Sequence, residues 1–310
     1  MAGQKSHIRI GTRASKLALT QSQWAADQIA AAHPGLTCEL IHVTTSGDRQ
    51  TAPPLPQIGG KGLFTKELEE ALLNGSIDLA VHSLKDLPTQ LPGQLAVACV
   101  PVRAPANDSL IIAERHVSRG VSRLFGLPHG ARVGTSSPRR VAQLLAVRPD
   151  LRCEPVRGNL DTRLRKLADG QFDAIVLALA GLTRLGLAEE ATEVLPFDLM
   201  LPAPGQGALA IEARVGTEAA ARATAIADEA TTVAVTAERA LLDALGGGCS
   251  MPLGAYAELT GGALRLRAIL FSPDRSRAAR ADRSGSAADP IALANAAAQD
   301  LRRGVTSRRS

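Results

Sequence analysis

The chain has 310 residues, of which 45% are hydrophobic and 21% charged, so it can bury sizeable cores, and its length suits two or three domains. Aromatic residues make up only 2%, which leaves few rings for stacking nucleic-acid bases and disfavours a protein that binds single strands. The formal charge of +5 suits an anionic partner, and because most arginines lie near acidic residues, we expect a small acidic ligand.

The sequence lacks the apolar segments that target a chain to membranes. Residues 1–13 have no apolar core of a signal peptide, and no run approaches the ~18 apolar residues that span a bilayer. We therefore expect a cytoplasmic protein without a membrane partner. The four cysteines, Cys38, Cys99, Cys153 and Cys249, are far apart and show no CxxC spacing, so we expect neither a metal site nor a disulfide framework.

The first third of the chain alternates predicted strands and helices. Apolar patterning predicts strands at His7–Thr12, Cys38–Thr44, Leu79–Ser83 and Leu95–Val100, and helices at Leu17–Ala32 and from a cap at Thr65 to Asn74. Between them, Thr45–Gly62 has no periodicity, and loops of this length are usually lids or binding loops. Val102–Pro105 is typical of a hinge that leads into a second α/β unit.

The second unit repeats this alternation. Strands are predicted at Leu110–Ala113, Arg132–Thr135, Arg152–Pro155 and Ala174–Ala178, and helices at Pro138–Ala146 and Leu160–Asp169. Alternation of this kind predicts a largely parallel sheet with helices on its faces. A strand at Ala208–Ala213, two Ala-rich helices, strands within Leu253–Phe271 and a helix at Pro290–Arg303 follow, and the last of these suit a small third domain.

An anion-binding wall is predicted from Gly134 to Arg163. Ser137 is a natural N-cap and Pro138 suits the first helical position, so backbone N–H groups, hydroxyls and the guanidinium groups of Arg139 and Arg140 would meet at a helix N-terminus. The next strand-to-helix turn adds Arg157-Gly158-Asn159 and Arg163 at the same sheet edge. The alternative is that these arginines are only solvent-exposed side chains on helix surfaces. The pattern does not indicate whether the bound anion is a phosphate or a carboxylate.

Two further motifs carry reactive groups. Asp86, in the run His82–Pro88, follows a strand and could stabilise a cation or relay a proton, or it could simply close an Asx turn. Cys249 follows three glycines on a turn that can approach a ligand closely, although a free cysteine is more often a small buried hydrophobe. Gly59–Gly62 lacks the Walker spacing, which excludes a nucleoside-triphosphate site of that kind.

Taken in order, these motifs resemble the porphobilinogen deaminase (hydroxymethylbilane synthase) family over nearly the whole chain. The matching segments are Gly11–Ser15, Gly59–Phe64, His82–Asp86, Gly134–Arg140, Arg157–Asn159, Leu201–Gly207 and Gly247–Cys249. Two positions depart from the family pattern: Gln57 stands where a basic residue is frequent, and Lys16 where proline is frequent. The first departure bears on how the Thr45–Gly62 loop would contribute to binding the pyrrole chain that this family builds.

The resemblance implies a transferase of tetrapyrrole, porphyrin and heme biosynthesis. Such an enzyme joins four porphobilinogen molecules head to tail onto a covalent dipyrromethane cofactor, with loss of ammonia from each, and releases 1-hydroxymethylbilane by hydrolysis. The implied fold is α/β with three domains, two resembling the lobes of type II periplasmic solute-binding proteins and a third of small α+β type. Their expected boundaries are 1–102 plus 207–224, 106–201 and 226–310, in a monomer.

The resemblance also implies residue roles. Cys249 would hold the cofactor by a thioether, and Asp86 would be catalytic and face the pyrrole nitrogens. Cofactor binding would further involve Lys85, Asp86, Thr135, Ser136, Ser137, Arg139, Arg140, Gly158 and Arg163. Substrate binding would involve Arg13, Ser15, Lys61, Phe64, Ser83, Arg157, Arg163, Arg184 and Gln206, with Lys61 and Phe64 in the loop that covers the cleft.

Two other classes of function deserve comparison with this prediction. A solute-binding module would have the same fold, but the missing signal peptide and the Gly248-Cys249 pair disfavour it. A nucleic-acid-binding protein would explain the basic charge and the paired arginines at 302–303 and 308–309, which we interpret as a solvated tail, and salt-dependent duplex binding would distinguish it.

Overall fold

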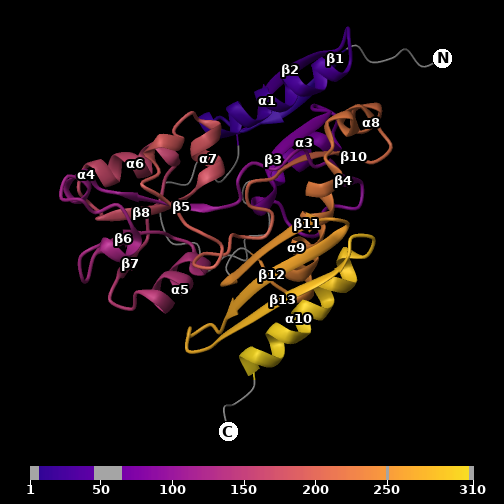
Figure 1. Cartoon of the computed structure of the whole chain (residues 1–310). Coiled ribbons are helices and arrows are strands. Elements are labelled where there is room, and N and C mark those ends of the chain that lie inside the picture. Colours follow the sequence, from indigo (N-terminus) through magenta and orange to yellow (C-terminus); the bar gives the residue numbers. More distant parts are fainter. Residues whose placement is uncertain (1–6, 45–64, 249–250, 307–310) are drawn as a thin grey trace. The chain divides into compact units, whose positions relative to one another are not determined.

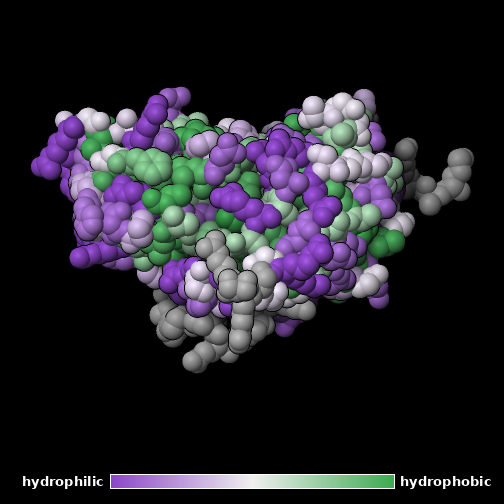
Figure 2. Space-filling view, turned by 60° about the horizontal axis from the view of Figure 1, so that its bottom comes forward, coloured by the Kyte–Doolittle hydropathy of each residue, from purple (hydrophilic) through white to green (hydrophobic). Residues whose placement is uncertain are grey.

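The computed structural model describes residues 7–44, 65–248 and 251–306. The chain divides into two compact units (Figure 1): the first contains Met1–Arg103 and Ala208–Thr232, and the second contains Ala104–Gly207 and Val233–Ser310. Within the described ranges, no helix is both long and apolar enough to cross a membrane. On the face presented in Figure 2, hydrophobic residues lie among hydrophilic ones, as is normal for a folded protein.

The first unit is built on a sheet with strand order β2-β1-β3-β10-β4. Its parallel strands are β1 (His7–Thr12), β2 (Thr37–His42) and β3 (Leu79–Ser83), and β10 (Leu209–Arg214) runs antiparallel between β3 and β4 (Leu95–Cys99). The helices of this unit are α1 (Lys16–Ala32), α3 (Lys66–Leu73) and α8 (Glu218–Ala223), with 3-10 turns η1 (Leu84–Asp86) and η4 (Thr224–Ile226). The late strand β10 therefore completes a sheet that the N-terminal segment begins.

In the first unit, α1 has a side-chain cap that was not predicted, and α3 lacks the one that was. Ser15 caps α1, because its hydroxyl accepts a hydrogen bond from Ala18 N at 3.3 Å. Thr65 occupies the N-cap position of α3, but its side chain makes no capping hydrogen bond. The prediction of a Thr65 cap was wrong because the residue has helical backbone angles, φ −114° and ψ −28°, whereas a capping residue is usually extended.

The second unit contains a sheet with the order β7-β6-β8-β5-β9. These strands are β5 (Asp108–Ile112), β6 (Arg132–Gly134), β7 (Arg152–Glu154), β8 (Ala174–Ala178) and β9 (Glu193–Val194). Its helices are α4 (Glu114–Val117), α5 (Pro138–Val147), α6 (Leu160–Ala168) and α7 (Leu179–Arg184), with η2 (Leu124–Gly126) and η3 (Ala188–Glu190). Apolar clusters cover both faces. As in the first sheet, the fourth strand is antiparallel, which confirms two similar α/β lobes.

The second unit also holds a three-stranded antiparallel meander, the third sheet. It consists of β11 (Leu253–Thr260), β12 (Ala263–Phe271) and β13 (Ala278–Ser286). Helix α10 (Pro290–Thr306) runs along this sheet (Figure 1), and α9 (Glu229–Ala244) contributes to the same core. The sequence prediction missed β13 because the outward positions of this strand carry charged residues such as Arg280 and Asp282, while the inward Ala279 and Ala281 are small.

A matched pair of glycine substitutions tests how tightly the second unit packs at Gly207. A Cβ at Gly207, where φ is +88°, would lie 2.4 Å from Ala104 O, whereas at Gly186, where φ is +70°, it would meet nothing within 4 Å. We expect Gly186→Ala to cost about 1 kcal/mol through backbone strain alone, and Gly207→Ala to cost clearly more because the backbone must also move. Urea unfolding of both variants measures the difference, and equal losses would contradict the clash.

Candidate active site

The first unit brings five of the predicted residues to one edge of its sheet. β1 and β3 are parallel neighbours, so the segments that follow them emerge at the same edge. Arg13 follows β1 and Ser15 caps α1, while Ser83 ends β3 and exchanges hydrogen bonds with Gln21. Lys85 and Asp86 lie on η1, where Lys85 is half-buried and Asp86 is exposed. A carboxylate is thus presented to solvent beside an ammonium group.

The second unit brings its arginines to the corresponding edge. β6 is parallel to both β7 and β8, and each of the three strands is followed by a segment that carries predicted binding residues. The segments are Thr135–Arg140 after β6, Arg157–Arg163 after β7, and α7, which ends in Arg184, after β8. Asp108 begins the antiparallel β5 opposite Ala178, the last residue of β8, so this carboxylate lies at the same edge.

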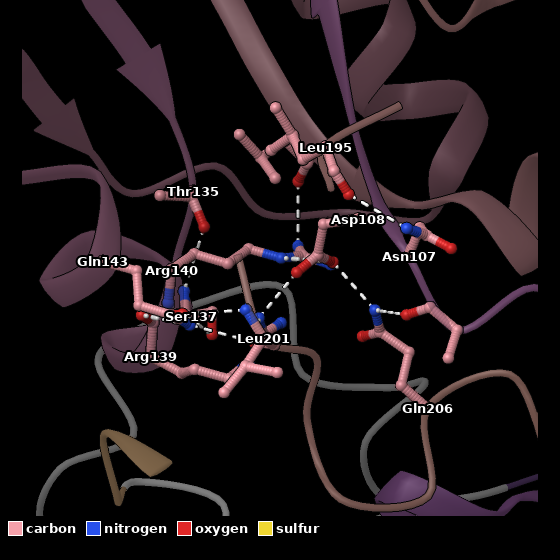
Figure 3. A network of polar contacts seen from close by, with 12 residues as sticks. Asn107, Asp108, Thr135, Ser137, Arg139, Arg140, Gln143, Leu195, Leu201 and Gln206 are labelled. Atoms are coloured by element: carbon pink, nitrogen blue, oxygen red, sulfur yellow. Dashed lines mark hydrogen bonds and ion pairs between the residues drawn. The ribbon is translucent and has the colours of Figure 1, made fainter. Parts of the chain in front are cut away.

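Asp108 is the centre of the buried network drawn in Figure 3. Its Oδ2 accepts a hydrogen bond from Arg139 Nη1 at 2.6 Å, and its Oδ1 accepts from Arg140 Nη2 at 2.7 Å and Nε at 3.1 Å. Gln206 Nε2 donates to the same Oδ1 at 2.9 Å. Asp108 and Gln206 are fully buried, and the two arginines are 4% and 6% exposed. We call this group the Asp108 cluster.

The Asp108 cluster has more positive than negative charge. Burial by itself raises the pKa of Asp108, but the attraction and hydrogen bonds of Arg139 and Arg140 outweigh it and hold that pKa well below its usual range. Asp108 is therefore ionised at neutral pH, and two guanidinium groups face one carboxylate. Burial of a net charge is unfavourable unless a counter-charge is present, so the site is suited to a second anion.

Donors remain for such an anion. A guanidinium carries five N–H groups. Three N–H groups of Arg140 donate to described residues, two of them to Asp108 and one to Val176 O. Arg139 uses two N–H groups, one for Asp108 and one for Leu201 O. Arg139 Nε is buried and has no acceptor among the described residues. A carboxylate placed here would provide both the missing acceptor and the missing charge.

Arg184 is a further desolvated cation at this edge. Burial lowers its pKa to about 10, so the side chain stays charged at neutral pH. Its Nη2 donates to Gly207 O at 2.7 Å, and no carboxylate pairs with it within the part of the chain that the structure describes. Arg157 is exposed, whereas Arg163 is half-buried and its Nε donates to Gly158 O at 2.9 Å.

Several residues of the predicted anion-binding wall also stabilise the turns in which they lie. We call its first segment, Gly134–Arg140, the cradle. Ser137 caps α5 by accepting from Arg140 N at 3.4 Å, and Pro138 is at the first helical position, as predicted. Ser136 Oγ donates to Val156 O at 2.9 Å, and Thr135 Oγ1 accepts from Ser137 N at 3.3 Å. Gly158 has φ +110°, and a Cβ there would lie 2.6 Å from Thr162, so only glycine suits this turn.

A cavity of about 720 Å³ lies beside the cradle within the second unit. Thr135 and Ser136 line it together with Gly246–Gly248 and Met251. Cys249 follows these glycines directly in the chain, but Cys249 itself, like Lys61 and Phe64, falls outside the described residues. Among the described residues, no group of three or more His, Cys, Asp or Glu side chains is arranged to hold a metal ion.

Sequence reasoning did not identify Asp108 and misjudged the surroundings of Gln206. The polar run Asn107–Ser109 ahead of the apolar residues Leu110–Ile112 was the available signal, since a buried acid requires a partner. Gln206 was predicted to contact substrate, but the structure buries it completely and directs its amide to Asp108 and to Ala106 O. In this conformation it supports the cluster from inside.

Comparison with known proteins agrees with this geometry. Residues 8–222 match the family described as "Porphobilinogen deaminase, dipyromethane cofactor binding domain", and residues 232–303 match "Porphobilinogen deaminase, C-terminal domain". The chain belongs to the porphobilinogen deaminase family. The porphobilinogen deaminase of Roseiflexus castenholzii is 51% identical over 298 residues, which cover 96% of each protein. That of Sorangium cellulosum is 52% identical over 90% of this chain and 91% of its own.

Some solved structures resemble this porphobilinogen deaminase family member at low sequence identity. An ancestral arginine-binding protein bound to arginine superposes with a TM-score of 0.38 and 15% sequence identity, covering 72% of this chain and 92% of that one. No conclusion about function rests on so distant a likeness.

The Asp108 cluster is expected to contribute strongly to the free energy of unfolding. Asp108→Asn leaves two buried guanidinium groups without their carboxylate, so we expect a loss of about 3–5 kcal/mol in the free energy of unfolding. Asp282→Asn is the control, because Asp282 pairs with Arg265 at the surface with 53% of its side chain exposed, and such pairs are worth at most about 1 kcal/mol. Urea unfolding at pH 7 compares the two.

The pH dependence of the free energy of unfolding tests whether the charge of Asp108 causes this loss. The pKa of Asp108 is depressed in the folded state, so its contribution is present above the unfolded pKa of about 3.9 and is lost as the pH falls through the folded value. The difference between wild type and Asp108→Asn should therefore shrink below about pH 4. A difference that stays constant down to pH 3 would show that charge is not the reason.

Proposed function

We propose that the protein is a hydroxymethylbilane synthase that joins four porphobilinogen molecules head to tail, releases one ammonia from each, and hydrolyses the product from the enzyme as 1-hydroxymethylbilane. Family membership over both matched regions supports this activity. The observation that carries it structurally is the Asp108 cluster, whose surplus charge and unused donors suit a substrate with an acetate and a propionate on every pyrrole. Each hydrogen bond between an arginine and a carboxylate is worth about 1.5–3 kcal/mol.

The dipyrromethane cofactor fits the residues of the second unit. When bound, it supplies the pyrrole to which the first substrate molecule is joined. We propose that Cys249 holds it by a thioether and that Arg139 Nε donates to one of its carboxylates. The other residues proposed to bind it are Lys85, Asp86, Thr135, Ser136, Ser137, Arg140, Gly158 and Arg163.

The described cysteines support the assignment of attachment to Cys249. Burial raises the pKa of Cys99 to about 12 and that of Cys153 to about 11. Both thiols therefore stay protonated at neutral pH, and a protonated thiol is a poor nucleophile. Cys153 lines the cavity beside Thr135 and Ser136, but its raised pKa keeps it protonated. Gly246–Gly248 line the same cavity and directly precede Cys249 in the chain.

We propose that Asp86 performs the proton chemistry. Its exposed carboxylate follows a rigid strand end, and Lys85 lies beside it in the turn. A carboxylate in this position can stabilise the positive charge that develops as ammonia leaves the substrate, and it can accept the proton that a pyrrole carbon loses after coupling. Lys85 contributes a cation for the carboxylates of bound pyrroles.

The remaining predicted residues are proposed to guide the substrate and the growing chain. These are Arg13, Ser15, Lys61, Phe64, Ser83, Arg157, Arg163 and Arg184, with Gln206 acting through Asp108. We also propose a cytoplasmic monomer with three domains, at 1–102 plus 207–224, 106–201 and 226–310. The second unit then comprises the arginine domain together with the domain that carries Cys249.

The covalent cofactor is tested by intact mass spectrometry of the denatured protein. Wild type should carry the mass of a dipyrrole adduct, because the thioether survives unfolding. Cys249→Ser should show the unmodified mass, and Cys153→Ser, which removes another thiol from the second unit, should keep the adduct. Active protein of unmodified mass would exclude the covalent cofactor, whereas inactive protein of unmodified mass would exclude the proposed function and leave a binding module as the alternative.

The role of Asp86 is tested by Asp86→Asn. The amide neither stabilises a cation nor takes a proton as a carboxylate does, so turnover should fall by about 10²–10⁴-fold, the usual contribution of a general acid or base, while the urea midpoint stays near that of wild type. Asp27→Asn is the control, since Asp27 is an exposed acid on α1 of the same unit. Wild-type turnover in Asp86→Asn would remove Asp86 from the mechanism.

A further inference from the structure

Gln143 lies one helical turn after Arg139 on α5 and holds the main chain of Leu201. Its Nε2 donates to Leu201 O at 2.9 Å, and Leu201 N donates to its Oε1 at 2.8 Å. Gln143 and Leu201 are each 3% exposed. Both ends of one buried amide thus pair with both main-chain groups of one residue, which fixes the position of Leu201 relative to α5.

The Leu201 carbonyl is also a partner of Arg139. Arg139 Nη1 donates to Leu201 O at 2.7 Å and to Asp108 Oδ2 at 2.6 Å. These two acceptors determine how the guanidinium plane is turned, and Figure 3 shows Gln143, Leu201 and Arg139 converging at this point. While Nη1 is held by these two acceptors, Arg139 Nε is buried and has no acceptor among the described residues.

The segment Leu201–Gly207, which we call the strap, is also held by β11 of the third sheet and by α9. Ala255 N donates to Pro202 O at 2.8 Å, and Gly205 N donates to Glu238 Oε2 at 2.7 Å. A Cβ at Gly254 would lie 2.8 Å from Leu201 Cβ, so β11 packs directly on the strap. Gln143 therefore joins α5 to a segment that the third sheet already holds in place.

We propose that Gln143 is a positioning residue for cofactor binding. It holds the Leu201 carbonyl where it fixes Arg139 Nη1, and this keeps Arg139 Nε directed to the carboxylate that the site is to bind. The proposal rests on the proposed function, because that carboxylate is taken to belong to the dipyrromethane cofactor. Gln143 does not touch the cofactor and acts only through Leu201 and Arg139.

The test uses Gln143→Met, which keeps a long side chain but loses both hydrogen bonds to Leu201. Leu144→Ala is the matched control, because Leu144 is the next residue of α5, is fully buried in the apolar core of the domain, and has a side chain that cannot hydrogen-bond to the strap. Each full-length variant is prepared as apoprotein in cells that make no porphobilinogen. Intact mass then follows the appearance of the dipyrrole adduct after porphobilinogen is added.

We expect Gln143→Met to acquire the adduct about tenfold more slowly than wild type, a loss typical of removing a residue that orients a ligand-binding side chain. Leu144→Ala should lose stability but acquire the adduct at the wild-type rate. Adduct formation at the wild-type rate in Gln143→Met, or an equal slowing in Leu144→Ala, would overturn the proposal, since the effect would then be absent or merely one of stability.

A second readout needs no cofactor. In the apoprotein, the Nε–H proton of Arg139 should exchange with solvent faster in Gln143→Met than in wild type or Leu144→Ala, as measured by NMR of the arginine side chains. If Gln143→Met does not fold, Gln143→Glu serves instead, because it keeps one acceptor for Leu201 N and replaces the donor to Leu201 O by a charge. Unchanged exchange in the folded variant would contradict the positioning role.

The two proposals fail in different ways. Wild-type protein that never acquires an adduct contradicts the proposed function, whatever Gln143 does, and the exchange of Arg139 Nε–H still decides whether Gln143 positions that side chain. Wild-type protein that acquires the adduct while Gln143→Met does so equally fast supports the function and rejects the role of Gln143.

Discussion

One buried carboxylate that faces two guanidinium groups determines most of the second unit's site. Asp108 cannot be ionised in the interior without Arg139 and Arg140, and neither arginine can be buried without Asp108. The three side chains therefore fix one another, and with them the N-terminal turn of α5. Because the charges do not cancel, the same arrangement that holds the helix in place leaves an attraction for an anion.

The antiparallel fourth strand explains how a buried acid comes to lie at the binding edge. The parallel strands β6 and β8 end at the binding edge, and their following segments carry the binding residues. The antiparallel strand β5 instead begins at this edge, so its first residue, Asp108, lies among those segments. The first unit uses the same order, and its fourth strand β10 carries the buried Glu212, whose Oε2 lies 2.9 Å from His82 Nε2. Each sheet thus has a buried carboxylate on its antiparallel strand.

Much of this fold was predictable from the sequence, because local patterns encode it. Apolar alternation predicted strands such as His7–Thr12, and the Ser137-Pro138 pair predicted the start of α5, since caps depend on neighbouring residues alone. The motifs also indicated which residues gather at the sheet edges, as strand order alone decides this. The resemblance was needed to distinguish a carboxylate from a phosphate as the ligand.

What the sequence could not reveal are interactions between distant segments. Asp108 and Gln206 are 98 residues apart and Gln143 and Leu201 are 58 apart, so no local spacing connects them. Both glutamines are buried polar residues that a composition-based argument would place at the surface. The strap appeared in the sequence only as a segment that resembles the family, although its backbone groups accept and donate the hydrogen bonds that hold Arg139 and Gln143.

The network also explains why arginine, and not lysine, suits position 139. The planar guanidinium holds two acceptors, Asp108 Oδ2 and Leu201 O, with Nη1 alone, and the remaining nitrogens project in fixed directions from the same plane. A lysine ammonium is a single point of charge, so bonds to the same two interior acceptors would draw its donors away from a ligand. One arginine can therefore be part of the buried structure and, in the proposed function, still donate to a carboxylate of the cofactor.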